Sequence, residues 1–255
     1  MSGRAVIVVP CYNEEQRIDA RTFIEFARSG QGDLLLVNDG SSDGTADVLA
    51  RIERAAPQTV RSLSLPQNRG KAEAVRQGLL AALGDGTALV GYADADLSTP
   101  FDELVRLREV ADQGSAQVVL GARVALLGRH IERSAMRHYF GRVFATAASV
   151  ILAQPVYDTQ CGAKFFRSTD ALRAALATPF SSAWAFDVEL IGRLLIGAPG
   201  VPALPAEDII EVPLQRWRDV RGSRMRPFDM IRAGLELGLI ARALHERKRA
   251  VERSG

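Results

Sequence analysis

Cysteine and histidine are scarce in this sequence. Its 255 residues include two cysteines, Cys11 and Cys161, and three histidines. Two cysteines cannot build a disulfide framework, and no Cys-x-x-Cys pair or Cys/His cluster points to zinc. The composition therefore argues against a small domain stabilised by disulfides or zinc, and it predicts a protein of the reducing cytoplasm.

Long apolar runs and a surplus of one charge are also lacking. No run approaches the roughly 18–20 apolar residues that a membrane-spanning helix needs. The apolar stretch 5–9 is too short for a signal peptide. The 32 basic and 30 acidic residues give a net charge of +2, so charge favours no particular partner and we expect no nucleic acid. With 47% hydrophobic residues, the bulk of the chain is expected to fold.

Short apolar runs alternate with helix-like segments over the first half of the chain. The predicted strands are 5–9, 33–37, 60–65, 87–92 and 116–122. The predicted helices between them are 14–29, about 42–55, 70–83 and a segment after Pro100. This alternation is typical of an α/β fold with a mainly parallel sheet flanked by helices. Later elements are predicted as helices at roughly 131–153, 184–197 and from about 228, and a strand at 209–217.

Polar clusters follow the predicted strands at their carboxyl ends. They are PCYNE (10–14), NDGSS (38–42), NRGK (68–71) and DADLS (94–98). Ligands of open α/β sheets bind beyond the carboxyl ends of the strands. We therefore expect the four clusters to meet at one binding site.

Two carboxylates, Asp94 and Asp96, stand directly after the fourth predicted strand. In an extended backbone, residues i and i+2 point the same way, so both side chains can lie on one side of a loop. Such a pair repels unless a cation neutralises it, and Mg²⁺ or Mn²⁺ suits carboxylate oxygens. The alternative is a plain turn, with Ser98 or Thr99 capping a helix whose first residue is Pro100.

Other phosphate-binding signatures do not fit. PCYNEE replaces the GxGxxG of dinucleotide-binding folds after the first strand, and Gly70–Lys71 is followed by Ala72, which a P-loop does not allow. A haloacid-dehalogenase-like phosphatase carries its DxD on the first strand, whereas here the motif follows the fourth. That class is left as a minor alternative.

Taken together, the motifs resemble family 2 glycosyltransferases. The stretches follow in order along nearly the whole chain: VVPCYNEE (8–15), VNDGSSDGT (37–45), NRGKAEAVRQG (68–78), DADLSTP (94–100), GAR (121–123), DTQCGAKFF (158–166), FDVEL (186–190) and EVPLQRWRDVRGSRMRP (211–227). The sequence is most similar to the polyprenyl-phosphate sugar synthases, and DTQCG favours their dolichyl-phosphate glucosyltransferase branch. The resemblance implies a Rossmann-like GT-A fold with a helical C-terminal extension.

The resemblance also implies an activity. It is the inverting transfer of a hexose from a nucleoside-diphosphate sugar to a polyprenyl phosphate, with Mg²⁺ or Mn²⁺ bound; the branch favours glucose and a UDP-sugar. Residues 1–226 would form the GT-A domain, with a nucleotide-sugar half (about 1–122) and an acceptor half (about 123–226), and 227–255 the C-terminal helix. A soluble enzyme acting on a small-molecule hydroxyl and a non-catalytic sugar-nucleotide-binding protein are the alternatives.

By the same resemblance, Asp96 and Asp94 are the metal ligands. The donor would be bound by Pro10, Tyr12, Glu14, Asp39, Lys71, Asp94 and Arg224. Lys71 opens a predicted helix, where the free N–H groups already favour an anion. A cation at that place indicates a diphosphate or carboxylate partner.

The acceptor decides which other residues matter. A hydroxyl needs a carboxylate to take its proton, and Asp187 stands in the place of the family's base. A lipid phosphate is already anionic and needs arginine to hold it, for which Arg123 is the candidate, together with Arg129, Arg133 or Arg137. Asp158 is expected to shape the loop or face the acceptor.

The last predicted helix has an apolar face and a basic end. Phe228, Ile231, Leu235 and Leu239 recur near helical spacing before the sequence HERKRAVER. This pattern suits an interfacial helix on the inner face of a membrane and equally a helix packed on the core. We expect peripheral membrane contact.

Overall fold

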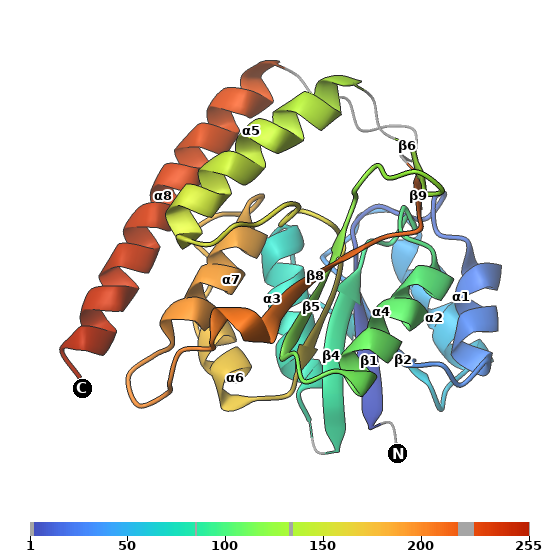
Figure 1. Ribbon diagram of the computed structural model, residues 1–255. Helices are drawn as coiled ribbons and strands as arrows, with labels where there is room; N and C mark the ends of the chain where they lie inside the picture. Colours follow the sequence, from blue (N-terminus) through green and yellow to red (C-terminus); the bar gives the residue numbers. More distant parts are fainter. Residues whose placement is uncertain (1–2, 85, 133–134, 219–226, 255) are drawn as a thin grey trace.

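A seven-stranded sheet forms the centre of the computed structural model, which describes residues 3–84, 86–132, 135–218 and 227–254 (Figure 1). In spatial order its strands are β3 (Val60–Ser64), β2 (Asp33–Asn38), β1 (Arg4–Cys11), β4 (Thr87–Ala93), β7 (Ala163–Arg167), β5 (Val118–Ala122) and β8 (Ile209–Pro213). All pairs are parallel except those of β7, which is antiparallel to β4 and β5. The predicted α/β class with a mainly parallel sheet is confirmed.

Alternate residues of the strands feed two separate apolar cores. Val8 and Tyr92 face one side, where they lie opposite each other in the β1–β4 ladder. That side is covered by α3 (Lys71–Ala82), α6 (Asp170–Leu176) and α7 (Phe186–Ile196). Ile7 and Phe165 face the other side, covered by α1 (Ala20–Arg28), α2 (Thr45–Ala55) and α4 (Phe101–Gln113). The result is a three-layer sandwich that leaves the strand ends open to solvent.

Two further helices lie outside this sandwich. The helices α5 (Ala135–Leu152) and α8 (Pro227–Glu252) run side by side and pack over α7 (Figure 1). A small second sheet pairs β6 (His130–Glu132) with β9 (Arg216–Arg218), and a short 3-10 helix spans Ala206–Asp208. Among the described residues, no helix combines the length and the apolarity that crossing a bilayer requires. The division of the chain into a domain of residues 1–226 and a C-terminal helix of residues 227–255 stays a prediction.

Some expected boundaries differ from the structure. The helix predicted at 14–29 begins at Ala20, because Asp19 caps it by accepting hydrogen bonds from Arg21 N and Thr22 N. The predicted cap of α4 is wrong: Pro100 is itself the N-cap residue, and no side chain caps the helix. The strand β7 and the helix α6 were not predicted, because AKFFR carries too little pattern to identify a strand.

A glycine allows α3 to pack closely on the sheet, and this generates a prediction. A methyl group at Gly78 would lie 2.3 Å from Val8 Cγ1 and 2.9 Å from Val37 Cγ2. We expect Gly78→Ala to lower the free energy of unfolding by about 1–3 kcal/mol through overpacking, despite the better helix propensity of alanine. Urea unfolding monitored by circular dichroism measures the change.

The matched control is Gly238→Ala, inside α8, where the new methyl group would meet no atom within 4 Å. It should be neutral or stabilising by up to about 1 kcal/mol. Equal effects of the two substitutions would contradict this account of α3 packing.

Candidate active site

The four predicted polar clusters meet at one cavity of about 280 Å³ at the carboxyl ends of β1, β2 and β4. Its lining residues are Pro10, Cys11, Tyr12, Glu14, Arg17, Asp39, Lys71, Ala74, Asp94, Ala95 and Asp96. The cavity thus gathers six of the predicted donor residues and both predicted metal ligands. Arg224 lies outside the described residues, as do the side chains of Arg133 and Arg137.

Lys71 and Asp94 form an ion pair in this cavity, with 2.5 Å between Lys71 Nζ and Asp94 Oδ1. The Lys71 side chain reaches solvent, yet the surrounding protein desolvates it and so works against its charge; Asp94, Asp187 and Asp96 outweigh that effect, so the pKa of Lys71 is raised. Asp39 fixes the backbone before Lys71, because its two carboxylate oxygens accept hydrogen bonds from Arg69 N and Gly70 N at 2.8 Å each. The loop after β2 therefore positions the lysine.

The second carboxylate, Asp96, is held by its neighbours. Asp96 Oδ1 accepts from Ser98 N at 3.0 Å and from Ser98 Oγ at 2.8 Å. Asp96 Oδ2 lies 3.3 Å from an Arg17 guanidinium nitrogen, and Arg17 also contacts Glu14 Oε1 at 3.0 Å. Ser98 thus orients Asp96, and Arg17 joins two carboxylates of the cavity.

Glu14 carries an unused acceptor. Its Oε2 atom is buried and has no hydrogen-bond partner within the described part of the chain. Burial raises the pKa of Glu14, Arg17 opposes that shift, and the carboxylates Asp96, Asp43 and Asp94 add to it. A buried acceptor without a donor is costly, so this oxygen fits a ligand hydroxyl or another donor entering the cavity.

The predicted acceptor-side residues do not line this cavity. Arg123 is engaged by Asp158 through two side-chain contacts, at 2.6 and 2.7 Å, and its own backbone N–H donates to the same carboxylate. The guanidinium also stacks on Trp217, 5.2 Å from the ring centroid. Asp158 therefore shapes its loop and orients Arg123.

Asp187 lies behind the cavity in a buried polar cluster. It is the second residue of α7 and only 6% exposed, and its carboxylate accepts a hydrogen bond from the Tyr92 hydroxyl. Lys164 Nζ lies 2.9 Å from Asp187 Oδ1, and Lys164 is the cross-strand neighbour of Tyr92. Burial raises the pKa of Asp187 to about 8, with Lys71 lowering it, and burial lowers the pKa of Lys164 to about 8.

A second cavity, of about 460 Å³, adjoins the first. Asp96 and Arg17 line both, and His130, Arg216, Trp217 and Arg218 form its far wall. The two spaces are therefore continuous at Arg17 and Asp96.

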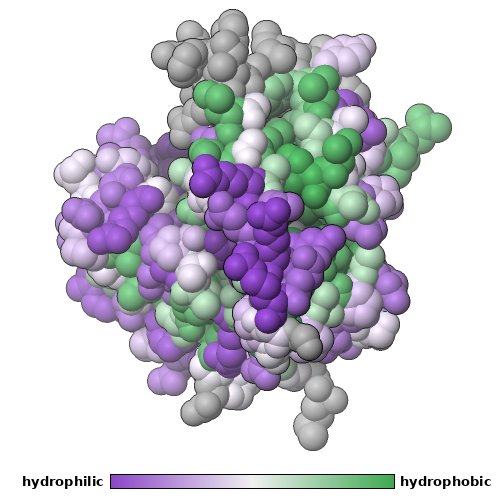
Figure 2. Space-filling view, turned by 90° about the vertical axis from the view of Figure 1, so that its left-hand side faces the viewer, coloured by the Kyte–Doolittle hydropathy of each residue, from purple (hydrophilic) through white to green (hydrophobic). Residues whose placement is uncertain are grey.

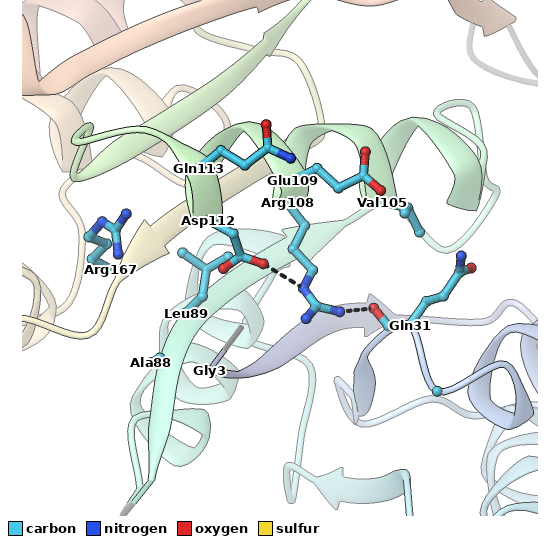
Figure 3. Close-up of a pocket in the computed structure, with 11 residues that line it drawn as sticks. Gly3, Gln31, Ala88, Leu89, Val105, Arg108, Glu109, Asp112, Gln113 and Arg167 are labelled. Atoms are coloured by element: carbon cyan, nitrogen blue, oxygen red, sulfur yellow. Dashed lines mark hydrogen bonds and ion pairs between the residues drawn. The ribbon is translucent and has the colours of Figure 1, made fainter. Parts of the chain in front are cut away.

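A larger cavity, of about 750 Å³, lies at the amino ends of β1 and β4 (Figure 3). Three of its charged side chains are held by the protein itself: Arg108 contacts Asp112, and Arg167 donates to the carbonyls of Ala111, Gly114 and Ala116. It presents none of the predicted site residues, so size alone does not mark the active site.

Similarity to known proteins agrees with this geometry. The sequence profile described as Glycosyl transferase family 2 matches residues 6–173, more than half of the chain. The chain belongs to this family. As a family 2 glycosyltransferase it is an enzyme, so the resemblance is confirmed and the phosphatase and non-catalytic alternatives are wrong.

Two relatives of this glycosyltransferase are named dolichyl-phosphate beta-glucosyltransferase. The one from Drosophila melanogaster is 31% identical over 256 residues, covering 92% of this chain and 73% of the relative. The one from Trichomonas vaginalis, ALG5C, is 29% identical over 248 residues, covering 92% and 69%. The similarity includes the predicted acceptor half as well as the first half.

Solved structures share its fold. Glucosyl-3-phosphoglycerate synthase from Mycobacterium tuberculosis in complex with UDP matches with a TM-score of 0.66 and 21% identity, covering 95% of this chain and 80% of that one. The same enzyme with Mn²⁺, UDP and glucosyl-3-phosphoglycerate gives 0.61 and 22%, covering 95% and 77%. At these identities the likeness shows the fold alone, and it confirms the GT-A class.

Several site residues of the glycosyltransferase were missed in the sequence. Arg17 follows Glu14 by three residues, a spacing at which two side chains meet when the backbone makes a turn. Lys164 stands between the apolar residues Ala163 and Phe165 of β7, which is a weak signal for a functional cluster. Gly162, which packs against the Asp94 carboxylate, carries no signal of its own.

The contact at Gly162 yields a prediction. A methyl group there would lie 2.1 Å from Asp94 Oδ2, so Gly162→Ala must displace that carboxylate and disturb the Lys71 pair. Misplacement of a reacting group by about 1 Å costs on the order of 100-fold in rate. We expect such a loss of glycosyl transfer with a cooperative unfolding transition retained. Gly84→Ala, where the methyl group would meet nothing within 4 Å, should keep full activity. An active Gly162→Ala enzyme would refute this placement of Asp94.

The raised pKa of Asp187 yields a second prediction. The folded state keeps its proton between the ordinary value of 3.8 and about 8, where the unfolded chain has lost it. The free energy of unfolding should therefore fall as the pH rises through that range, by at most about 1.4 kcal/mol per pH unit. Asp187→Asn removes this dependence.

Urea unfolding of both proteins at pH 5 and pH 7.5 measures the difference in slope. Asp47→Asn, which changes an exposed carboxylate of α2, serves as the control. Parallel slopes for the wild type and Asp187→Asn would mean that Lys164 keeps Asp187 ionised throughout.

Proposed function

We propose that this glycosyltransferase moves glucose from UDP-glucose to a polyprenyl phosphate, with inversion at the anomeric carbon and with Mg²⁺ or Mn²⁺ as cofactor. The observation that carries the proposal is the similarity, over 92% of the chain, to relatives named dolichyl-phosphate beta-glucosyltransferase. The cavity supports it, since carboxylates and cations suited to a diphosphate meet there.

The donor is proposed to bind between β1, β2 and β4. Pro10, Tyr12 and Glu14 line the cavity on the β1 side, and the unpartnered Glu14 oxygen would accept a hydrogen bond from a donor hydroxyl. Asp39 contributes by holding the loop that presents Lys71. Lys71 and Arg17 bring positive charge to the place proposed for the diphosphate.

The residues fit a divalent cation. Asp94 and Asp96 line the same cavity, while the described residues contain no group of three His, Cys, Asp or Glu side chains that could hold a metal alone. Two carboxylates completed by substrate phosphates are a common Mg²⁺ arrangement. When bound, the ion would stabilise the negative charge that develops on the departing UDP.

In the proposed reaction a phosphate oxygen of the acceptor bonds to the anomeric carbon, and the bond from that carbon to UDP breaks with its electron pair leaving on UDP. A single displacement of this kind inverts the carbon. No proton has to be removed from an anionic phosphate, so a buried Asp187 is compatible with the step. Arg123, oriented by Asp158, stays our candidate for holding the acceptor phosphate.

We place the lipid-facing surface on α5 and α8. Large apolar side chains are exposed there: Tyr139, Val143 and Val150 on α5, and Leu235 and Leu239 on α8. Figure 2 views the side of the molecule on which α8 lies and shows apolar areas beside a strongly hydrophilic one. The side chains of Phe228 and Ile231 lie outside the described residues. This surface supports peripheral contact with the inner face of a membrane.

The test is transfer of labelled glucose from UDP-glucose to undecaprenyl phosphate in detergent. We expect lipid-linked glucose with Mg²⁺ or Mn²⁺, none with a chelator, and recovery when metal is added back. Asp96→Asn should lower transfer by about 100-fold, whereas Asp47→Asn should not. UDP should raise the melting temperature in a metal-dependent manner.

If GDP raises the melting temperature more than UDP does, the donor is a GDP-sugar and the proposed UDP-glucose is wrong. Transfer to a small hydroxyl or phosphorylated acceptor but not to the lipid would replace the proposed acceptor and leave the soluble alternative.

A further inference from the structure

The C-terminal helix reaches the turn that leads into α7. Glu236, on α8, is only 9% exposed, although its neighbour Leu235 is 68% exposed. Its Oε2 atom accepts hydrogen bonds from Ser182 Oγ, from Trp184 N at 3.0 Å and from Ala185 N at 3.3 Å. One carboxylate thus accepts hydrogen bonds from three donors of the segment 182–185, about fifty residues away in the sequence.

These donors have a structural need for an acceptor. Ala185 is the N-cap residue of α7 and caps it with no side chain of its own. Backbone N–H groups buried without an acceptor are destabilising, and a negative charge near a helix N-terminus is favoured. Ala185 N donates to Ser182 Oγ as well, at 2.8 Å. Glu236 shares that donor with Ser182, is the acceptor for Ser182 Oγ and Trp184 N, and brings its negative charge from another helix.

The same turn is fixed on its other sides. Glu189 of α7 accepts hydrogen bonds from Ser181 N at 2.8 Å and Ser181 Oγ at 2.9 Å. The Trp184 ring packs against Phe140 and Phe144 of α5, with centroids 6.3 and 5.3 Å apart. Residues 181–185 are therefore held between α5, α7 and α8.

The first residues of α7, directly after this turn, pack against β4, the strand that leads to Asp94. Phe186 packs on Tyr92, with ring centroids 6.0 Å apart, and Asp187 contacts the Tyr92 hydroxyl and Lys164. Tyr92 precedes Asp94 by two residues, at the end of β4. A shift of residues 182–185 would therefore move Asp187 and Phe186 against the strand that presents the carboxylate pair.

We propose that Glu236 is a positioning residue for glycosyl transfer: it ties the C-terminal helix to the start of α7 and so holds Phe186 and Asp187 against β4. The inference rests on the proposed place of Asp187 at the site and does not depend on which acceptor the enzyme uses. It gives α8 a part in the reaction besides its exposed apolar face.

The test compares Glu236→Ala, Glu236→Gln and Glu246→Gln. Glu246 lies on the same helix but is exposed and pairs with Arg242, so it is the matched control. We expect Glu236→Ala to lower kcat about tenfold, counted per UDP-binding site, with the KM for UDP-glucose within about twofold of the wild type. Glu236→Gln keeps an oxygen that accepts from the N–H groups and should recover much of the rate.

Rates are measured with undecaprenyl phosphate and, separately, as UDP release from UDP-glucose with water as acceptor. The second assay distinguishes failure of this inference from failure of the proposed acceptor. Trp184 emission gives an independent readout: Glu236→Ala should shift it to longer wavelength, and Trp184→Phe identifies the signal. If Glu236→Ala does not fold, Ser182→Ala, which removes one of the three donors to Glu236 and leaves Glu236 as the acceptor of Ala185 N, should show a two- to threefold loss.

A merely structural role would reduce the number of UDP-binding sites and the rate together, leaving kcat per site unchanged. That result in either folded variant, or unchanged Trp184 emission in Glu236→Ala, would overturn the inference.

Discussion

Neutralisation of crowded carboxylates at the carboxyl edge of the sheet is the constraint on which the active site depends. Glu14, Asp94 and Asp96 line one small cavity, and like charges this close repel. Arg17 and Lys71 offset the repulsion, each within 3.3 Å of a carboxylate oxygen. Ion pairs as exposed as these add little to stability. These ion pairs matter for the electrostatic field inside the cavity, where cations and carboxylates lie side by side. Such a field suits a ligand that carries negative charge and binds a cation.

Backbone contacts, more than side-chain packing, set the places of these charges. The Asp39 carboxylate accepts from the two N–H groups before Lys71, so the lysine follows the loop after β2. Gly162 lies so close to Asp94 that no side chain fits between them. Gly162 is there because β7 enters the sheet antiparallel between β4 and β5. The same insertion brings Lys164 beside Tyr92 and into contact with Asp187, which joins the second half of the chain to the strand that precedes the carboxylate pair.

The features of this arrangement that depend on local sequence patterns could be predicted from the sequence. Apolar β-branched runs identified β1, β2 and β4, and turn-forming residues at their ends identified the clusters around Asp39 and Asp94. The features that were not predicted depend on tertiary contact. AKFFR lacks the β-branched apolar run that identified the other strands. Nothing near Glu236 in the sequence indicates that it accepts hydrogen bonds from Ser182 and Ala185. The cap of α4 was misassigned because Pro100 adopts an extended backbone that serves as the cap itself.

The burial of Asp187 separates two kinds of glycosyl transfer. A general base must come within hydrogen-bond distance of the proton it removes, and geometry precedes pKa in judging a candidate. The raised pKa of Asp187, about 8, would suit a base, yet its carboxylate is occupied by Tyr92 and Lys164 and lines neither cavity. Both contacts fall on Asp187 Oδ1 inside a buried cluster, so an acceptor hydroxyl would have to enter that cluster to reach the carboxylate, whereas an acceptor phosphate needs no base. The arrangement is compatible with the anionic acceptor that we propose, and Asp187 contacts Tyr92 of β4 from the start of α7.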